Sequence, residues 1–362
     1  MFRDTEILDE TQRLHQIFRN RGALSIEPDL LQPADLLLDL YGEDIRARAY
    51  LTYDPLRGEQ MLRPDYTVPV AQSHIEGLAN SAKYTYAGKV FRKQEEDSEC
   101  PNELIQVGYE CFGDNNSALA DADVFAALLE ALSGLNTCVQ TGDMSLLIAA
   151  VLGLKTSEER KAALLRHIWR PQRFHLLLSK FSGQLPRSPD LTAILSKKDP
   201  FHGTGPFIGI RSKVEIIERL DRLRANDADP PISASEMELL SEITKIRDTY
   251  PKVLRKLNDL MVDLPSISQA IDRIKRRIDA FEGQGIDTAL MSFEASYGQT
   301  SMEYYDGFVF GFYVKSLKGN FLIATGGRYD ALTRHLGNGI KLPAVGGVIR
   351  PDLLVQAKRQ II

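Results

Sequence analysis

Cysteine is scarce in this chain of 362 residues, and its placement excludes several kinds of site. The three cysteines, Cys100, Cys111 and Cys138, are odd in number and lack C-x-x-C spacing, which argues against a disulfide framework and a zinc site. The six histidines contain no H-x-x-x-H or H-x-x-H pair. The sequence also lacks the G-x-S-x-G, P-loop and G-x-G-x-x-G patterns. We therefore expect no metal and no cofactor.

Long apolar runs and an excess of positive charge are also absent. The longest apolar run, 146–154, is shorter than the roughly 20 residues that cross a bilayer, and the acidic start MFRDTEILDE has no apolar signal region. A formal net charge of −5 gives no general attraction to phosphate backbones. We expect a soluble, cytoplasmic protein with neither a membrane nor tRNA as partner. Its 43% hydrophobic content is enough for a large core.

Hydrophobic periodicity divides the chain into a core and an insertion. Residues 155–263 are rich in Lys, Arg, Glu and Leu at helical spacing, whereas 1–154 and 264–362 mix strands with helices. We predict an α+β fold with a discontinuous core, 1–154 and 264–362, and a helical insertion, 155–263. The predicted helices of the core are 5–21, 121–133 and 264–284. The predicted strands are 24–27, 83–93, 104–112, 138–141, 287–295, 303–314 and 320–325.

Three of the predicted strands carry glycines on a polar face. Alternation in LIQVGYECF puts Gln106, Gly108 and Glu110 on one face, and the same rule places Gly88 and Gly307 on the polar faces of their strands. Glycine inside a strand indicates close approach of a ligand or another backbone. The alternative is that these are ordinary solvated faces of half-buried strands. The Gly-Gly pair in ATGGRYDAL, between a strand and a helix, leaves the same two interpretations open.

Five segments in order resemble motifs of histidyl-tRNA synthetase and of its paralogue, the regulatory subunit of ATP phosphoribosyltransferase. MLRPDYTVPVA, 61–71, resembles the LRPE-G-T segment, and YAGKVFR with LIQVGYECFG resembles the second class II motif. EYYDGFVF resembles the RGLDYY segment, TGGRYDAL resembles GGRYDGL, and LPAVGG resembles the start of the third motif. The resemblance covers the whole chain outside the insertion.

This resemblance implies a class II aminoacyl-tRNA synthetase-like antiparallel sheet flanked by helices, commonly dimeric through the N-terminal region. It also implies a histidine-sized pocket, with Arg92 at the position of the arginine that meets the α-phosphate. The residues that match the lining of the amino-acid site are Asp65, Thr67, Gln106, Glu110, Tyr305 and Tyr329.

The departures from the synthetase pattern concern catalysis. Thr300 stands where the synthetase has the arginine that stabilises the reacting carboxylate and phosphate, and losing such a donor costs about a hundred- to a thousand-fold in rate. Leu353 stands at the phosphate-binding arginine of the third motif, while Arg350 lies three positions early. The loop 94–103 carries five acidic residues and no Lys or Arg, so it would repel ATP. Too few residues follow Arg350 for an anticodon-binding domain, so we expect none.

We therefore interpret the chain as a non-catalytic regulatory subunit of ATP phosphoribosyltransferase, the enzyme of the first step of histidine biosynthesis. The resemblance implies a short-form catalytic subunit as partner, a homodimer within a hetero-octamer, and feedback regulation by histidine. One alternative is a stand-alone ligase that adenylates an amino acid. Another is a pure scaffold with a vestigial pocket. The sequence leaves open the partner interface, the stoichiometry, the role of the insertion, and whether histidine binds this pocket or a subunit interface.

Overall fold

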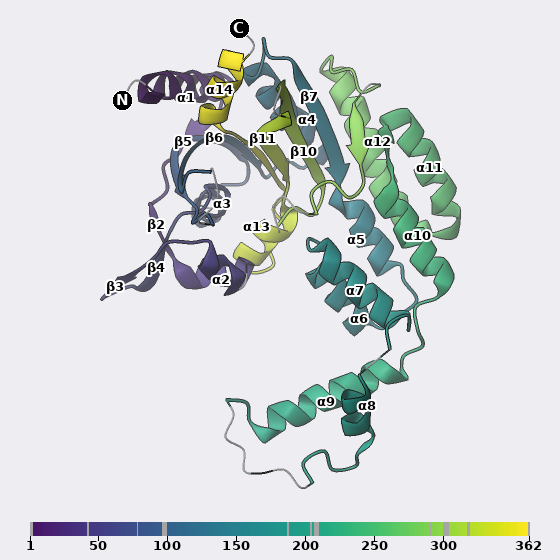
Figure 1. Cartoon of the computed structure of the whole chain (residues 1–362). Coiled ribbons are helices and arrows are strands. Elements are labelled where there is room, and N and C mark those ends of the chain that lie inside the picture. Colours follow the sequence, from purple (N-terminus) through teal and green to yellow (C-terminus); the bar gives the residue numbers. More distant parts are fainter. Residues whose placement is uncertain are drawn as a thin grey trace.

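A mixed β-sheet forms the centre of the molecule (Figure 1). The computed structural model describes residues 3–41, 43–77, 79–95, 100–186, 188–202, 205, 210–289, 291–299, 304–316 and 319–360. Within these ranges the strand order of the large sheet is β1-β5-β6-β12-β11-β10-β7-β9-β8. The strands are β1 (Leu24–Ser25), β5 (Ala82–Phe91), β6 (Glu103–Phe112), β7 (Thr137–Asp143), β8 (Arg247–Thr249), β9 (Ser292–Glu294), β10 (Phe308–Ser316), β11 (Gly319–Arg328) and β12 (Ala344–Ile349).

Antiparallel pairing runs through the centre of this sheet, from β5 to β7, as the α+β, class II synthetase-like prediction requires. The pairs β1–β5 and β7–β9 near the two ends are parallel. A smaller antiparallel sheet stands beside it in the order β2-β4-β3. Its strands are β2 (Leu31–Pro33), β3 (Leu51–Asp54) and β4 (Gly58–Leu62).

The helices of the two core segments flank the large sheet. Asn116 caps α4 by accepting a hydrogen bond from the Leu119 N–H, so this helix begins before the predicted Asp121. The helices and 3₁₀ turns are α1 (Arg3–Asn20), α2 (Ala34–Tyr41), η1 (Glu43–Ala47), α3 (Thr67–Glu76), α4 (Ser117–Ala131), α5 (Met144–Leu152), η2 (Pro265–Ile267), α12 (Ser268–Gly283), α13 (Asp330–Leu336) and α14 (Pro351–Gln360).

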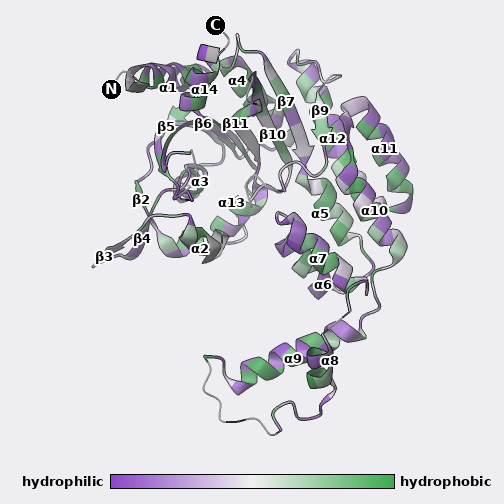
Figure 2. Ribbon diagram, viewed as in Figure 1, coloured by the Kyte–Doolittle hydropathy of each residue, from purple (hydrophilic) through white to green (hydrophobic). Residues whose placement is uncertain are grey.

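Residues 155–263 contain mainly helices. Serine capping boxes start two of them, where Ser212 and Glu215, and Ser233 and Glu236, satisfy each other's backbone N–H groups. Figure 1 shows α8 and α9 farthest from the sheet, and Figure 2 shows hydrophobic and hydrophilic residues alternating along these helices. The strand β8 lies within this range and joins the large sheet. The division into core and insertion stays a proposal. The helices are α6 (Glu158–Arg166), α7 (Pro171–Phe181), α8 (Pro189–Ser196), α9 (Lys213–Ala228), α10 (Ala234–Lys245) and α11 (Tyr250–Asp263).

An aromatic cluster joins β10 to the helices behind the sheet. Phe125 of α4 lies 4.9 Å from Phe281 of α12 and 5.2 Å from Phe310, measured between ring centroids. Phe308 and Phe312 belong to the same cluster, so β10 presents its phenylalanines to the core. None of the helices in the described ranges combines the length and apolar character needed to cross a bilayer.

Two predicted strands begin later in the structure because acidic side chains redirect the backbone. The Asp287 carboxylate accepts the Ala289 N–H, which makes a turn, and β9 begins only at Ser292. The Asp306 carboxylate accepts the N–H groups of Asp330 and Ala331 at the start of α13, and β10 begins after it, at Phe308. The predicted start of this strand at Glu303 lies outside the described residues.

Candidate functional site

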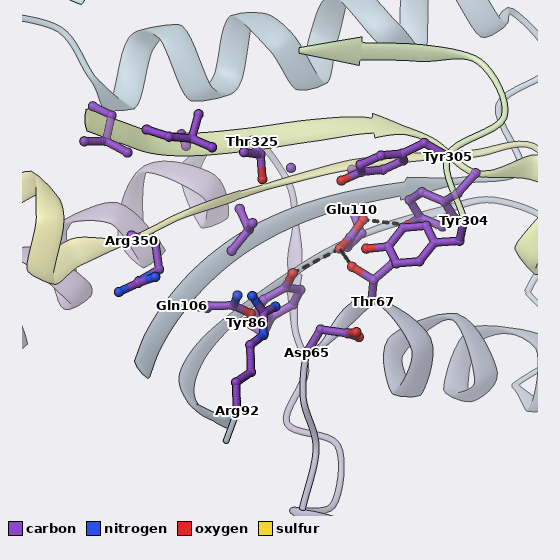
Figure 3. A pocket seen from close by; sticks show the side chains of 17 residues that line it. Asp65, Thr67, Tyr86, Arg92, Gln106, Glu110, Tyr304, Tyr305, Thr325 and Arg350 are labelled. Atoms are coloured by element: carbon purple, nitrogen blue, oxygen red, sulfur yellow. Dashed lines mark hydrogen bonds between the residues drawn. The ribbon is translucent and has the colours of Figure 1, made fainter. Parts of the chain in front are cut away.

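All seven predicted site residues line one pocket of about 140 Å³ over the front of the sheet (Figure 3). The strands β5, β6, β11 and β12 contribute most of its lining, together with the start of α3 and the segment before β10. The lining residues are Asp65, Thr67, Tyr86, Arg92, Gln106, Glu110, Tyr304, Tyr305, Leu322, Ile323, Ala324, Thr325, Tyr329, Gly346, Gly347, Val348 and Arg350.

Glu110 is the most buried acidic group of this pocket, with 1% of its surface exposed. Three hydroxyl groups donate to its carboxylate, from Tyr329 at 2.6 Å, Thr67 at 3.0 Å and Tyr86 at 3.1 Å. Burial raises the pKa of Glu110 to about 7, and the three hydrogen bonds only partly offset that rise. The carboxylate is therefore held in one orientation and gains stability when a positive charge arrives beside it.

An aromatic stack supports Glu110 from below. The Tyr86 ring lies parallel to the Tyr66 ring, with centroids 4.2 Å apart, and the Arg63 guanidinium lies 3.9 Å from the Tyr66 centroid on its face. Arg63 is buried and donates to the carbonyls of Lys89 and Pro28. Since each ring is fixed by its neighbour, the Tyr86 hydroxyl is pre-positioned for Glu110.

A second carboxylate, Asp65, stands beside Glu110 at the start of α3. Its Oδ1 accepts the Val68 N–H at 3.2 Å, so it serves the first turn of that helix. Asp65 is 5% exposed and raises the pKa of Glu110 further by like-charge repulsion. This end of the pocket therefore favours a cation.

Two arginines also line the pocket. The Arg92 Nε donates to the Pro64 carbonyl at 2.8 Å, and Arg350 makes a two-pronged contact with the Asp352 carboxylate at 3.0 and 2.7 Å. Figure 3 places Gln106 between these two arginines. Because each guanidinium is fixed by its partner, both can meet an anion without reorganising. The pocket thus presents both carboxylates and guanidinium groups.

The strand glycines make room for the chain's own side chains. A Cβ at Gly108 would come within 2.1 Å of the Tyr86 ring, and a Cβ at Gly88 would come within 2.1 Å of the Tyr66 hydroxyl. At Gly346 a Cβ would overlap the Glu110 carboxylate. The solvated-face interpretation is wrong, because Gln106 and Glu110 are both buried. The glycines act on the pocket indirectly. Because they have no side chain, the tyrosine rings and the Glu110 carboxylate can lie over the backbone at these positions.

Gly108→Ala is expected to destabilise the fold by roughly 1–3 kcal/mol and to displace Tyr86 from Glu110, because the added methyl group overpacks the contact. Urea denaturation and histidine titration would measure the two effects. Gly283→Ala, at the end of α12 with open space around its Cα, is the matched control and should leave both unchanged. Equal behaviour of the two variants would contradict the packing argument.

Sequence reasoning missed several lining residues. Tyr86 shares the polar face of β5 with Gly88, and this alternation was the available signal. Arg350 does not align with the synthetase arginine, so the sequence does not predict it as a site residue. It follows β12 directly, and this position brings it to the pocket. Thr300 and the acidic residues Glu96, Asp97 and Glu99 lie outside the described residues. Among the described residues no group of three or more His, Cys, Asp or Glu side chains could hold a metal ion.

The comparisons with known proteins agree with this architecture. The family model described as histidyl-tRNA synthetase matches residues 5–195 and 214–354. An ATP phosphoribosyltransferase regulatory subunit of Allorhizobium ampelinum is 31% identical over 351 residues, which cover 91% of this chain and 92% of the relative. The chain belongs to the family of ATP phosphoribosyltransferase regulatory subunits. Another regulatory subunit of this family, from Brucella canis, is 30% identical and is covered to 93% of its length.

Solved structures of the wider synthetase-like group share the fold. A structure described as an ATP phosphoribosyltransferase regulatory subunit/histidyl-tRNA synthetase from Bacillus halodurans has a TM-score of 0.68 at 20% identity. The match covers 97% of this chain and 79% of that chain. Histidyl-tRNA synthetase from Nostoc has a TM-score of 0.63 at 18% identity, with 98% of this chain and 72% of that chain covered. Membership of the regulatory-subunit family thus goes with a class II synthetase-like core.

Proposed function

We propose that the chain is the histidine-sensing regulatory subunit of an ATP phosphoribosyltransferase, with catalysis carried out by a short-form catalytic subunit. The observation that carries this proposal is a pocket lined by both carboxylates and arginines, in a chain that belongs to the regulatory-subunit family. Glu110 and Asp65 stand where an ammonium group would be bound, and Arg92 and Arg350 stand where a carboxylate would be bound. A free amino acid carries both groups.

The requirements of a sensor differ from those of a synthetase. A sensor needs differential affinity for its effector in two states of the assembly, and it does not need groups that stabilise a transition state. The replacement of the synthetase arginine by Thr300 removes a transition-state group and leaves the buried carboxylate end of the pocket complete. Arg350 lines the pocket with its charge balanced by Asp352, and it does not restore the third-motif arginine at Leu353.

Assembly follows from the same proposal. The chain would pair with itself and join the catalytic subunit in a hetero-octamer in the cytoplasm, without tRNA. It would make histidine, the end product, the signal that lowers phosphoribosyl transfer.

Calorimetric titration of the purified chain with histidine, and separately with ATP, is the direct test. It would be followed by an assay of phosphoribosyl transfer by a short-form catalytic subunit with and without this chain. The proposal predicts histidine binding, no ATP binding, and histidine-sensitive transfer only in the mixture. ATP binding with amino-acid-dependent pyrophosphate exchange would instead establish a stand-alone ligase. Histidine-insensitive transfer in the mixture would leave a scaffold.

Histidine binding should also release protons near neutral pH. With its pKa raised to about 7, Glu110 is about half protonated in the empty pocket at pH 7, and a bound ammonium group favours the ionised form. The pKa of Glu110 therefore falls on binding, so affinity should rise with pH up to about 7 and then level off. Calorimetry in two buffers of different ionisation enthalpy would measure the protons released. The imidazole group of the free histidine ligand is at most about a quarter protonated at pH 7, so it can contribute at most about a quarter of the one proton that could be released. A release no larger than that would contradict the assignment to Glu110.

A further inference from the structure

The single tryptophan of the chain, Trp169, connects the helical segment to the pocket. It lies between α6 and α7, and its indole Nε1 donates to the backbone carbonyl of Tyr305 at 2.9 Å. The preceding residue makes a second connection, since the Gln299 side-chain amide donates to the Ile168 carbonyl at 3.1 Å in a buried contact. The turn between α6 and α7 is therefore attached both to Gln299 and to Tyr305.

Tyr305 has little freedom to adjust independently of its backbone. Its ring packs against Gly327 of β11, where an added Cβ would come within 2.7 Å of it, and its ring centroid lies 4.9 Å from that of Tyr304. The side chain is 5% exposed and lines the pocket. A hydrogen bond that fixes the Tyr305 carbonyl thus also fixes where its ring meets a ligand.

The support behind Trp169 is itself well packed. Ile168 is 1% exposed and Phe174 of α7 is fully buried. On α6, the buried Arg160 donates to the Pro230 carbonyl at 2.7 Å and to the Asn226 side chain at 2.7 Å, which ties the end of α9 to α6. A continuous set of contacts therefore runs from Tyr305 through Trp169 and α6 to α9.

We propose that Trp169 is a positioning residue, whose indole N–H holds Tyr305 against the bound histidine and transmits occupancy of the pocket to the α6–α9 segment. The inference rests on the proposed function and gives residues 155–263 a role in it. An indole suits the position because it is a donor without an acceptor, so it pairs with a carbonyl in a single orientation. Phenylalanine would preserve the ring and remove the donor.

The first test uses the natural chain, in which Trp169 is the only tryptophan and so the only source of indole fluorescence. Titration with L-histidine should change the emission of Trp169 with the same midpoint as the calorimetric binding curve. In Glu110→Gln the change should disappear over the same concentration range. Constant emission at saturating histidine would overturn the proposed transmission and needs no variant that has to fold.

The second test compares Trp169→Phe with Leu176→Ala. Losing one hydrogen bond is expected to weaken histidine binding about fivefold in Trp169→Phe, and to reduce the histidine sensitivity of the assembled enzyme. Leu176 is 60% exposed on α7, so its truncation changes the same segment away from the pocket and should leave histidine affinity unaltered. Thermal melting would show that both variants are folded.

The outcomes separate this inference from the proposed function. If histidine binds and Trp169→Phe retains the natural affinity, the positioning role is wrong while the sensor proposal stands. If calorimetry detects no histidine binding to the natural chain, the sensor proposal fails and the role of Trp169 falls with it. Equal losses in Trp169→Phe and Leu176→Ala would show a general effect of the helices and would overturn the specific role.

Discussion

Glu110→Gln is expected to lower the affinity for histidine by roughly a hundredfold or more, because a buried charge pair is lost. The Thr67, Tyr86 and Tyr329 hydroxyls all donate to this carboxylate. A carboxamide offers them one oxygen and an NH₂ group that cannot accept, so one donor also loses its partner. Calorimetry with the isolated chain measures the affinity, and the transfer assay with the catalytic subunit should show feedback lost while assembly survives.

The matched control for this variant is Glu103→Gln on the same strand. Glu103 is exposed and pairs with Lys89 at the surface, where an ion pair contributes at most about 1 kcal/mol. The control should therefore bind histidine like the natural chain. Retained feedback in Glu110→Gln would mean that histidine acts elsewhere, for example at a subunit interface.

Asp121→Asn is expected to reduce the free energy of unfolding by about 3 kcal/mol, because it removes one charge from a buried ion-pair network. The Asp121 carboxylate, 2% exposed, accepts from Arg277 Nε at 2.9 Å and from Arg328 Nη2 at 2.6 Å. In this variant Arg277 still pairs with Asp143 and Arg328 still pairs with Asp330, so the expected loss stays at about 3 kcal/mol rather than above it. Urea denaturation followed by circular dichroism measures the change.

Asp272→Asn on α12 is the control for the buried network. Its carboxylate is exposed and lies 4.0 Å from the Lys275 ammonium, so its loss should cost less than about 0.5 kcal/mol. Similar midpoints for the two variants would show that the Asp121 network contributes little net stability. Histidine affinity should be unchanged in both variants, because neither residue lines the pocket.

The sequence predicts strand faces better than it predicts strand ends. Alternation correctly separates Gln106 and Glu110 from Val107 and Tyr109, because side chains on successive residues must point to opposite faces. It cannot predict where an acidic side chain leaves the strand to accept backbone N–H groups, as Asp306 does before β10. It also begins a helix at Asp121, whereas in the structure Asp121 lies inside α4 and is buried against two arginines.

The pocket was predictable to the extent that its residues match motifs. The seven matched positions line one pocket, and the resemblance of the five motifs to those of one known fold made this predictable. Tyr86, Arg350 and the function of the glycines required the structure, since they depend on which side chain crosses which neighbouring strand. That Trp169 reaches Tyr305 depends on the packing of α6 and α7 and has no local signal.

The order of the strands also has a consequence for biosynthesis. Glu110 of β6 lies opposite Gly346 of β12, and β7 pairs with β10. The ribosome must therefore translate to Ile349 before β6 gains its second neighbour, although β5 and β6 can form a hairpin much earlier. Such distant pairings slow folding, so the nascent polypeptide exposes an unpaired β6 edge for most of its synthesis. The pocket is therefore completed late in translation, and a ligand that binds it can stabilise only the chain in which β12 has joined the sheet.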